Sequence, residues 1–177
     1  LEADGTFAHF PFERFSEFYA DFGDYDVSLT MPEEFVVAAV GKEIERSVRD
    51  GKRTTRHVQS SVIDFAFAAW DGFALETRSA GNVQLSCVFP RGQEKAARIQ
   101  LEAAAAGLDY FSRAFGAYPY ETLTLVHPPS GAGEAGGMEY PTLITTGAEL
   151  DVRIPARILE ILTLHELAHQ WFMGLVA

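Results

Sequence analysis

The chain has 177 residues, of which 47% are hydrophobic, and its 25 acidic and 14 basic side chains give a net charge of −11. This length and this apolar share are sufficient for one sizeable domain or for two small domains with buried cores. The negative charge argues against nucleic acid or an anionic membrane surface as the partner, and a cation is a better match.

No targeting segment is recognisable at the start of the chain, which begins with Leu1 and not with methionine. A signal peptide would show a basic stretch followed by an apolar one, and neither is present. No window of about 18 uninterrupted apolar residues occurs, so we expect no membrane span. We therefore expect the sequence to be an excerpt of a longer protein, with any targeting segment outside it.

Short runs of alternating apolar and polar residues dominate the chain up to about residue 90. The run YDVSLTM places Val27, Leu29 and Met31 on one face, and FVVAAVG, RHVQSSVIDFAFAAW and NVQLSCVF follow it. Pro, Gly, Asp and Asn separate these runs, which indicates turns between antiparallel strands. Cys87 alternates with apolar neighbours, and we expect it to be a buried core thiol.

The pattern changes after PRGQ, where residues 94–115 are rich in alanine and other helix-favouring residues. Ile99, Leu108 and Phe111 recur at helical spacing, and Gly116 is a stop signal, so we predict a helix there. A strand-like run ETLTLVH, a loop PPSGAGEAGG and a second strand-like run MEYPTLITTG follow. The change from alternating runs to helix-favouring residues therefore suggests a domain boundary near residue 90.

A last helix is predicted near the end of the sequence. Asp151 and Pro155 are good start signals, because proline suits a first helical turn, where its missing N–H costs nothing. The residues from Ala156 onward leave almost no polar face, so most sides of this helix should be buried.

The segment TLHELAHQWF, Thr163–Phe172, carries two histidines and a glutamate inside this apolar helix. His165 and His169 are four residues apart, so both imidazoles lie on one helix face and can reach one metal ion. Glu166 lies about 100° further round the helix, where it can touch a water on that metal without being a ligand. Two preset neutral nitrogen ligands suit zinc. Two hydrogen-bonded core histidines are the alternative, but they would leave a buried carboxylate without a counter-ion.

The stretch GGMEYPTLI, Gly136–Ile144, resembles the G-x-M-E-N motif of the gluzincin zinc aminopeptidases, the family of alanyl and puromycin-sensitive aminopeptidases. The form HELAHQWF is similar to the zinc helix of that family, and EFYADFGDYDV and DFAFAAW look like strands of its preceding β-domain. The resemblance implies an α+β fold. Residues 1–90 would be part of an antiparallel β-rich N-terminal domain, and residues 91–177 would be the first portion of a thermolysin-like zinc peptidase domain.

The resemblance also implies how a peptide substrate would bind. Glu139 would hold the free α-amine of the peptide, which is why members of the family remove residues from the N-terminus. The backbone of Gly136, Gly137 and Met138 would run beside the substrate as an added strand, because glycine allows close approach. Tyr140 stands where the family motif has asparagine, a form associated with some bacterial members.

For the metal, the resemblance implies one zinc ion with His165 and His169 as two of its three protein ligands and Glu166 as the general base. The third ligand, a glutamate, and the tyrosine that would steady the oxyanion are expected beyond Ala177. We therefore expect the 177-residue chain by itself to bind zinc weakly and to hydrolyse peptides negligibly.

Two alternatives remain open beside the aminopeptidase. Tyr140 leaves room for a zinc endopeptidase, which would accept a peptide with a blocked N-terminus. The second alternative is a folded, non-catalytic scaffold. We further expect self-association through exposed apolar side chains of the last helix, namely Leu164, Leu167, Trp171 and Phe172.

Several other features carry little weight. GAGEAG, Gly131–Gly136, matches G-x-G-x-x-G, but a strand-like run follows it where a dinucleotide site needs a helix. His9, His57 and His127 have no partner at ligand spacing, so we expect them to be surface or hydrogen-bonded histidines.

Overall fold

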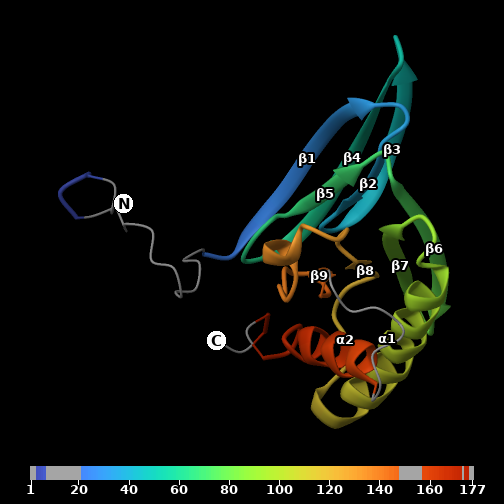
Figure 1. The fold of residues 1–177 in the computed structure, drawn as a ribbon. Helices are drawn as coiled ribbons and strands as arrows, with labels where there is room; N and C mark the ends of the chain where they lie inside the picture. The colour runs from blue at the N-terminus through green and yellow to red at the C-terminus, as the bar shows by residue number, and fades with distance from the viewer. Residues whose placement is uncertain (1–2, 7–20, 148–156, 173, 176–177) are drawn as a thin grey trace.

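The computed structural model describes residues 3–6, 21–147, 157–172 and 174–175. A long three-stranded sheet extends away from a second region, in which two helices lie beside a four-stranded sheet (Figure 1). The elements in chain order are β1 (Gly23–Pro32), β2 (Val36–Ala39), β3 (Lys42–Arg49), β4 (Lys52–Val62), β5 (Phe67–Trp70), β6 (Phe73–Ala80), β7 (Val83–Pro90), α1 (Glu94–Phe115), β8 (Thr122–Val126), the short 3₁₀ helix η1 (Gly133–Ala135), β9 (Leu143–Thr145) and α2 (Ile158–Ala168).

The strands before residue 72 pair antiparallel, as the alternating runs predict. β1, β4 and β3 form one sheet in that order, and β2 pairs with β5 in a second, two-stranded sheet. Side chains alternate along β1, where Leu29 is buried and its neighbours Ser28 and Thr30 are exposed. Every pair formed among the described strands between Gly23 and Pro90 is antiparallel, which confirms the predicted antiparallel β-rich region.

The four-stranded sheet has the order β6-β7-β8-β9, and it crosses the boundary expected near residue 90. β6 and β7 form an antiparallel pair, whereas β7 pairs in parallel with β8, and β8 in parallel with β9. α1 connects β7 to β8, so the change from alternating runs to helix-favouring residues near residue 90 marks the connection from a strand to a helix. The division into two domains at residue 90 stays a prediction. Among the described strands, the change of sheet comes between β5 and β6.

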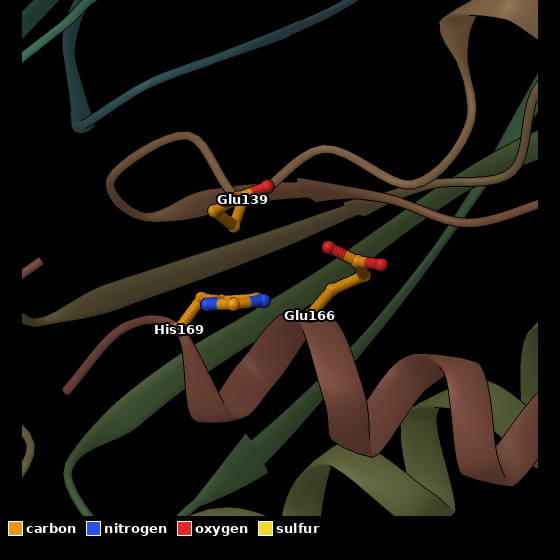
Figure 2. A group of neighbouring side chains, drawn as sticks. All are labelled: Glu139, Glu166 and His169. Atoms are coloured by element: carbon orange, nitrogen blue, oxygen red, sulfur yellow. The ribbon is translucent and has the colours of Figure 1, made fainter. Parts of the chain in front are cut away.

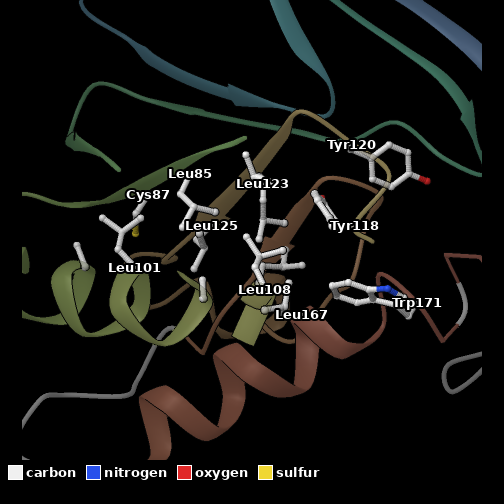
Figure 3. Close-up of a cluster of buried hydrophobic side chains, with 14 of the residues drawn as sticks. Leu85, Cys87, Leu101, Leu108, Tyr118, Tyr120, Leu123, Leu125, Leu167 and Trp171 are labelled. Atoms are coloured by element: carbon white, nitrogen blue, oxygen red, sulfur yellow. The ribbon is translucent and has the colours of Figure 1, made fainter. Parts of the chain in front are cut away.

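The inner strands of the four-stranded sheet are buried on both faces over part of their length, since Cys87–Phe89 of β7, Leu123–Val126 of β8 and all of β9 are buried. Leu85 and Cys87 of β7 pack on one face with Leu101 of α1 (Figure 3). Val88 points to the opposite face, where it packs with Val40 beside β2. Cys87 is a buried thiol, as expected.

The helix predicted over residues 94–115 is α1, which packs against β6, β7 and α2. Gly107 lies at the crossing of the two helices, where an added Cβ would come within 2.5 Å of Leu164 Cδ2 and 2.7 Å of Leu167 Cδ2. The absence of a side chain at this position therefore lets α2 approach α1 closely.

The expected exposure of the last helix is wrong at two of its four positions. Leu167 and Trp171 are buried in the core with α1, and the Trp171 Nε1–H donates a hydrogen bond to the Gly116 carbonyl at 2.9 Å. Leu164 is partly buried against the same core, whereas Phe172 is 48% exposed. α1 covers the apolar side of α2 that the sequence alone left without a partner, and self-association stays a prediction.

The second strand-like run, MEYPTLITTG, is a strand only at Leu143–Thr145. A turn precedes it, in which the Leu143 N–H donates to the Tyr140 carbonyl at 3.0 Å and Thr142 has a left-handed φ of 60°. Pro141 has no N–H to donate to a ladder, and it ends any strand that begins at Met138. The start signals Asp151 and Pro155 lie outside the described residues.

Candidate metal and peptide site

α2 presents Glu166 on a face that is turned toward the β9 edge of the sheet (Figure 2). The helix is anchored by buried side chains that include Leu159, Thr163 and Leu167. It ends at Ala168, so His169 lies at the helix C-cap and not in the helix interior that the sequence predicts. Glu166 is only 3% exposed, which makes it a buried carboxyl group at the end of an apolar helix.

His169 is held in one tautomer by the turn that follows the helix. Its Nδ1 lies 3.1 Å from the carbonyl oxygen of Phe172. A carbonyl oxygen can only accept, so Nδ1 carries the proton and donates, and Nε2 keeps its lone pair. Metal-binding histidines in proteins commonly use this arrangement, because the backbone hydrogen bond orients the ring and fixes the ligand nitrogen.

Three side chains from two distant segments converge at this point. Glu139, Glu166 and His169 each offer one ligand atom, and these atoms all lie within 4.8 Å of one another. Figure 2 shows Glu139 on the loop beside β9 and the other two side chains on α2 and the turn after it. The two sequence motifs therefore meet in space.

The surroundings of Glu166 disfavour its charged form. Burial raises the pKa of Glu166 above its ordinary value, and the nearby carboxylate of Glu139 adds to this rise, whereas His165 and His169 act in the opposite direction. A carboxyl group with a raised pKa next to imidazoles is well suited to proton transfer. Perturbed carboxyl groups of this kind are common at functional sites.

His165 lies beside this cluster and is more exposed than His169. The two imidazole rings have centroids 4.9 Å apart and meet edge to face, with an interplanar angle of 86°. Among the described residues, the group of ligand atoms within 4.8 Å includes His169 but not His165. That both imidazoles bind one ion stays a prediction.

The glycine-rich segment lies along the outer side of β9, the last strand in the sheet order. The N–H groups of Gly137 and Met138 donate to the Thr145 carbonyl, and the Thr145 N–H donates back to the Met138 carbonyl. An added Cβ at Gly136 would lie 2.6 Å from the carbonyl oxygen of Thr146. The close approach that requires glycine at this position is therefore to the neighbouring strand.

The remaining histidines do not join the cluster. His57 is buried and its Nε2 is hydrogen-bonded to Thr55 Oγ1 at 3.0 Å, while its Nδ1 has no partner among the described residues. His127 is buried and its Nδ1 lies 2.9 Å from Gln100 Nε2. Both are hydrogen-bonded histidines, as expected, whereas His9 lies outside the described residues.

Sequence reasoning overlooked Gln170, which follows His169 and is buried. Its carboxamide hydrogen-bonds to the backbone of Tyr140 and of Thr142, which flank Pro141 just after Glu139. The available signal was a polar residue inside an apolar segment, since buried amides in proteins are almost always hydrogen-bonded.

Two known proteins, one matched by sequence and one by structure, are similar to this chain. No family model matches the chain. Aminopeptidase 2 from Candida albicans is 36% identical to it over 94 residues, which cover 48% of this chain and 10% of that protein. The crystal structure of the M1 zinc metallopeptidase from Deinococcus radiodurans matches with a TM-score of 0.65 and 22% identity, over 88% of this chain and 35% of the other.

The structural likeness establishes the fold: the chain is mixed α+β, and its architecture is that of the matching part of the Deinococcus metallopeptidase. The chain spans about a tenth of the length of the curated relative and about a third of the solved structure. Within the described ranges, neither α1 nor α2 has the length and apolar character that a membrane-crossing helix needs.

Proposed function

We propose that the chain is part of a zinc-dependent metallopeptidase of the gluzincin aminopeptidase family, which removes N-terminal residues from peptides. The observation that carries this proposal is the approach of Glu139 to Glu166 and His169, with ligand atoms within 4.8 Å of one another. A carboxylate next to a metal centre is suited to hold a substrate ammonium group. The names of the matched proteins, an aminopeptidase and a zinc metallopeptidase, agree with this assignment.

The donor groups fit zinc. Zinc in catalytic sites takes imidazole nitrogens and carboxylate oxygens, and His169 offers an Nε2 whose lone pair is left available by the Nδ1–H bond to Phe172. His165 and His169 would hold the ion, with a third protein ligand expected beyond Ala177. When bound, zinc supplies a Lewis acid that polarises a carbonyl and lowers the pKa of a water molecule.

Each residue of the cluster would have a separate role in hydrolysis. Glu166 would accept a proton from the attacking water and return it to the leaving amine. Glu139 would accept a charge-assisted hydrogen bond from the free α-ammonium group of the substrate. The segment Gly136–Met138 would run beside the substrate backbone and would offer it carbonyl oxygens, since the N–H groups of Gly137 and Met138 donate to Thr145. A fixed distance between Glu139 and Glu166 would then place the first peptide bond for cleavage.

The test uses the full-length protein that carries this sequence, with measurement of its zinc content and of the hydrolysis of an amino-acid anilide. Glu166→Gln should lower kcat by about 10²- to 10⁴-fold with the zinc content unchanged, because it removes the proton acceptor. Glu139→Gln should instead raise KM, since it removes the charge that pairs with the ammonium group.

An N-acetylated version of the same substrate is the control. Zinc-dependent cleavage of the acetylated substrate at the rate of the free one would indicate the endopeptidase that Tyr140 leaves open. Absence of both zinc and turnover in the full-length protein would indicate a non-catalytic scaffold and would contradict the proposal.

A further inference from the structure

The Gln170 carboxamide is 1% exposed and makes its hydrogen bonds to the backbone of the loop that carries Glu139. Its Oε1 accepts from the Thr142 N–H at 2.8 Å, and its Nε2 donates to the Tyr140 carbonyl at 3.1 Å. The Glu139 carbonyl lies 3.5 Å from the same Nε2. One side chain therefore uses both its donor and its acceptor on this loop.

The loop has a conformation that needs such support. Thr142 has a φ of 60°, which is rare for a β-branched residue, and such conformations persist only where the surroundings hold them. Pro141 contributes no N–H that could fix the turn. Thr142 Oγ1 accepts a buried hydrogen bond from the Gly41 N–H at 2.7 Å. The turn is thus tied to the N-terminal strands on one side and to the end of α2 on the other.

Glu139 lies between two anchors. On its N-terminal side, Met138 is bridged to Thr145 of β9. On its C-terminal side, the backbone of Tyr140 and Thr142 is held by Gln170. Gln170 also follows His169 directly in sequence. The hydrogen bonds of Gln170 therefore connect the turn that carries His169 to the loop that carries Glu139.

We propose that Gln170 is a positioning residue, which fixes the distance of the Glu139 carboxylate from Glu166 and His169. The inference rests on the proposed aminopeptidase function. It names Gln170 as the residue that keeps the Glu139 carboxylate at a fixed position relative to the C-terminal end of α2. Loss of the carboxamide frees the loop at Tyr140 and Thr142, and Glu139 then moves independently of α2. The consequence is weaker selection for a free N-terminus, with the metal site itself intact.

A purely structural role for Gln170 predicts a different result. A buried polar side chain in or just after α2 can contribute to stability alone, and its loss would then lower activity toward all substrates alike. Thr163 is a matched control, because it is buried on α2, seven residues before Gln170, and its Oγ1–H donates to the Leu159 carbonyl at 2.7 Å, away from the Glu139 loop. Thr163→Val removes a buried polar group at nearly constant volume, and so does Gln170→Met.

The experiment compares wild type, Gln170→Met, Gln170→Glu and Thr163→Val in the full-length protein. It measures zinc content, kcat and KM for an amino-acid anilide, and the inhibition constants of an amino-acid amide and its N-acetyl analogue. We expect Gln170→Met to raise KM for the free substrate by about 10- to 100-fold and to reduce the preference for the free amine. Gln170→Glu keeps an acceptor for the Thr142 N–H and should be intermediate, and Thr163→Val should leave the preference unchanged.

The outcomes separate the two proposals. If wild type itself does not distinguish the free amide from the acetylated one, the aminopeptidase function fails, whatever the variants do. If wild type does distinguish them and the Gln170 variants lose activity only through kcat, with the preference retained, the positioning role is overturned. If Gln170→Met does not fold, Gln170→Glu alone decides, because an unchanged preference in it overturns the role of the Tyr140 bond.

Discussion

Substitutions at Thr142 separate the contribution of one buried hydrogen bond to the stability of the fold from the contribution of side-chain shape. Its Oγ1 accepts from the Gly41 N–H, and both residues are buried. Thr142→Val keeps the branched side chain but leaves the Gly41 N–H without an acceptor, which should cost about 1–3 kcal/mol. Thr142→Ser keeps the acceptor and deletes one buried methyl group, which should cost about 0.8 kcal/mol. Serine also lacks the β-branch that a left-handed φ disfavours.

The expected order of the free energy of unfolding is therefore wild type, then Thr142→Ser, then Thr142→Val. Urea-induced unfolding followed by circular dichroism gives these free energies, and hydrogen exchange of the Gly41 amide reports on the bond itself. In Thr142→Val the Gly41 amide should exchange faster even if the global stability changes little. Equal stability and equal Gly41 protection in the two variants would refute the argument that this bond ties the N-terminal strands to the Glu139 loop.

Three further outcomes follow from particular contacts. Gly136→Ala places a Cβ 2.6 Å from the Thr146 carbonyl oxygen, so it should displace the loop from β9 and lower stability by about 1–3 kcal/mol, measured by urea unfolding. Burial lowers the pKa of His57, so below about pH 6.5 the unfolded chain takes up a proton more readily than the folded chain, and the free energy of unfolding should fall as the pH falls. His57→Gln should make this pH dependence weaker. Parallel plots of the free energy of unfolding against pH for the two proteins would contradict a role of His57. Burial also raises the pKa of the Cys87 thiol, so a thiol reagent should label the native chain far more slowly than the urea-unfolded chain, and fast native labelling would show that the β7 core is open.

Local sequence patterns predicted two kinds of element: helices whose apolar residues recur at helical spacing, and strands with one buried and one exposed face. α1 has the predicted bounds because its apolar residues repeat at helical spacing and Gly116 follows them. β1 was predictable because one of its faces is buried and the other is exposed. β3 was not, since every side chain of KEIERSVR is exposed, so no alternation of apolar residues marks the strand, which pairs with β4. Sheet membership across residue 90 depends on contacts far apart in sequence, which periodicity does not encode.

The site was predictable to the extent that residue type and spacing determine it. The spacing of HELAH predicted that His165 and His169 share one helix face with Glu166 beside them, and the resemblance of GGMEYP predicted that Glu139 lies near them. In the structure Glu139, Glu166 and His169 come together, and His169 lies at the C-cap of α2. The tautomer of His169 depends on its hydrogen bond to the Phe172 carbonyl, and the turn that makes this bond cannot be read from the HELAH spacing. The role of Gln170 depends on a loop some thirty residues earlier, so only the folded chain shows its partners.

The two tryptophans of the chain report on different parts of the fold. Trp171 is buried between α1 and the end of α2, with its indole N–H bonded to Gly116, so its fluorescence should be blue-shifted and shielded from aqueous quenchers. Trp70 is 36% exposed on β5 and should be quenched readily. A Trp171→Phe variant leaves only the emission of the small β2-β5 sheet. Comparison of its denaturation curve with that of Trp70→Phe would show whether the N-terminal strands and the helical region unfold as one cooperative body.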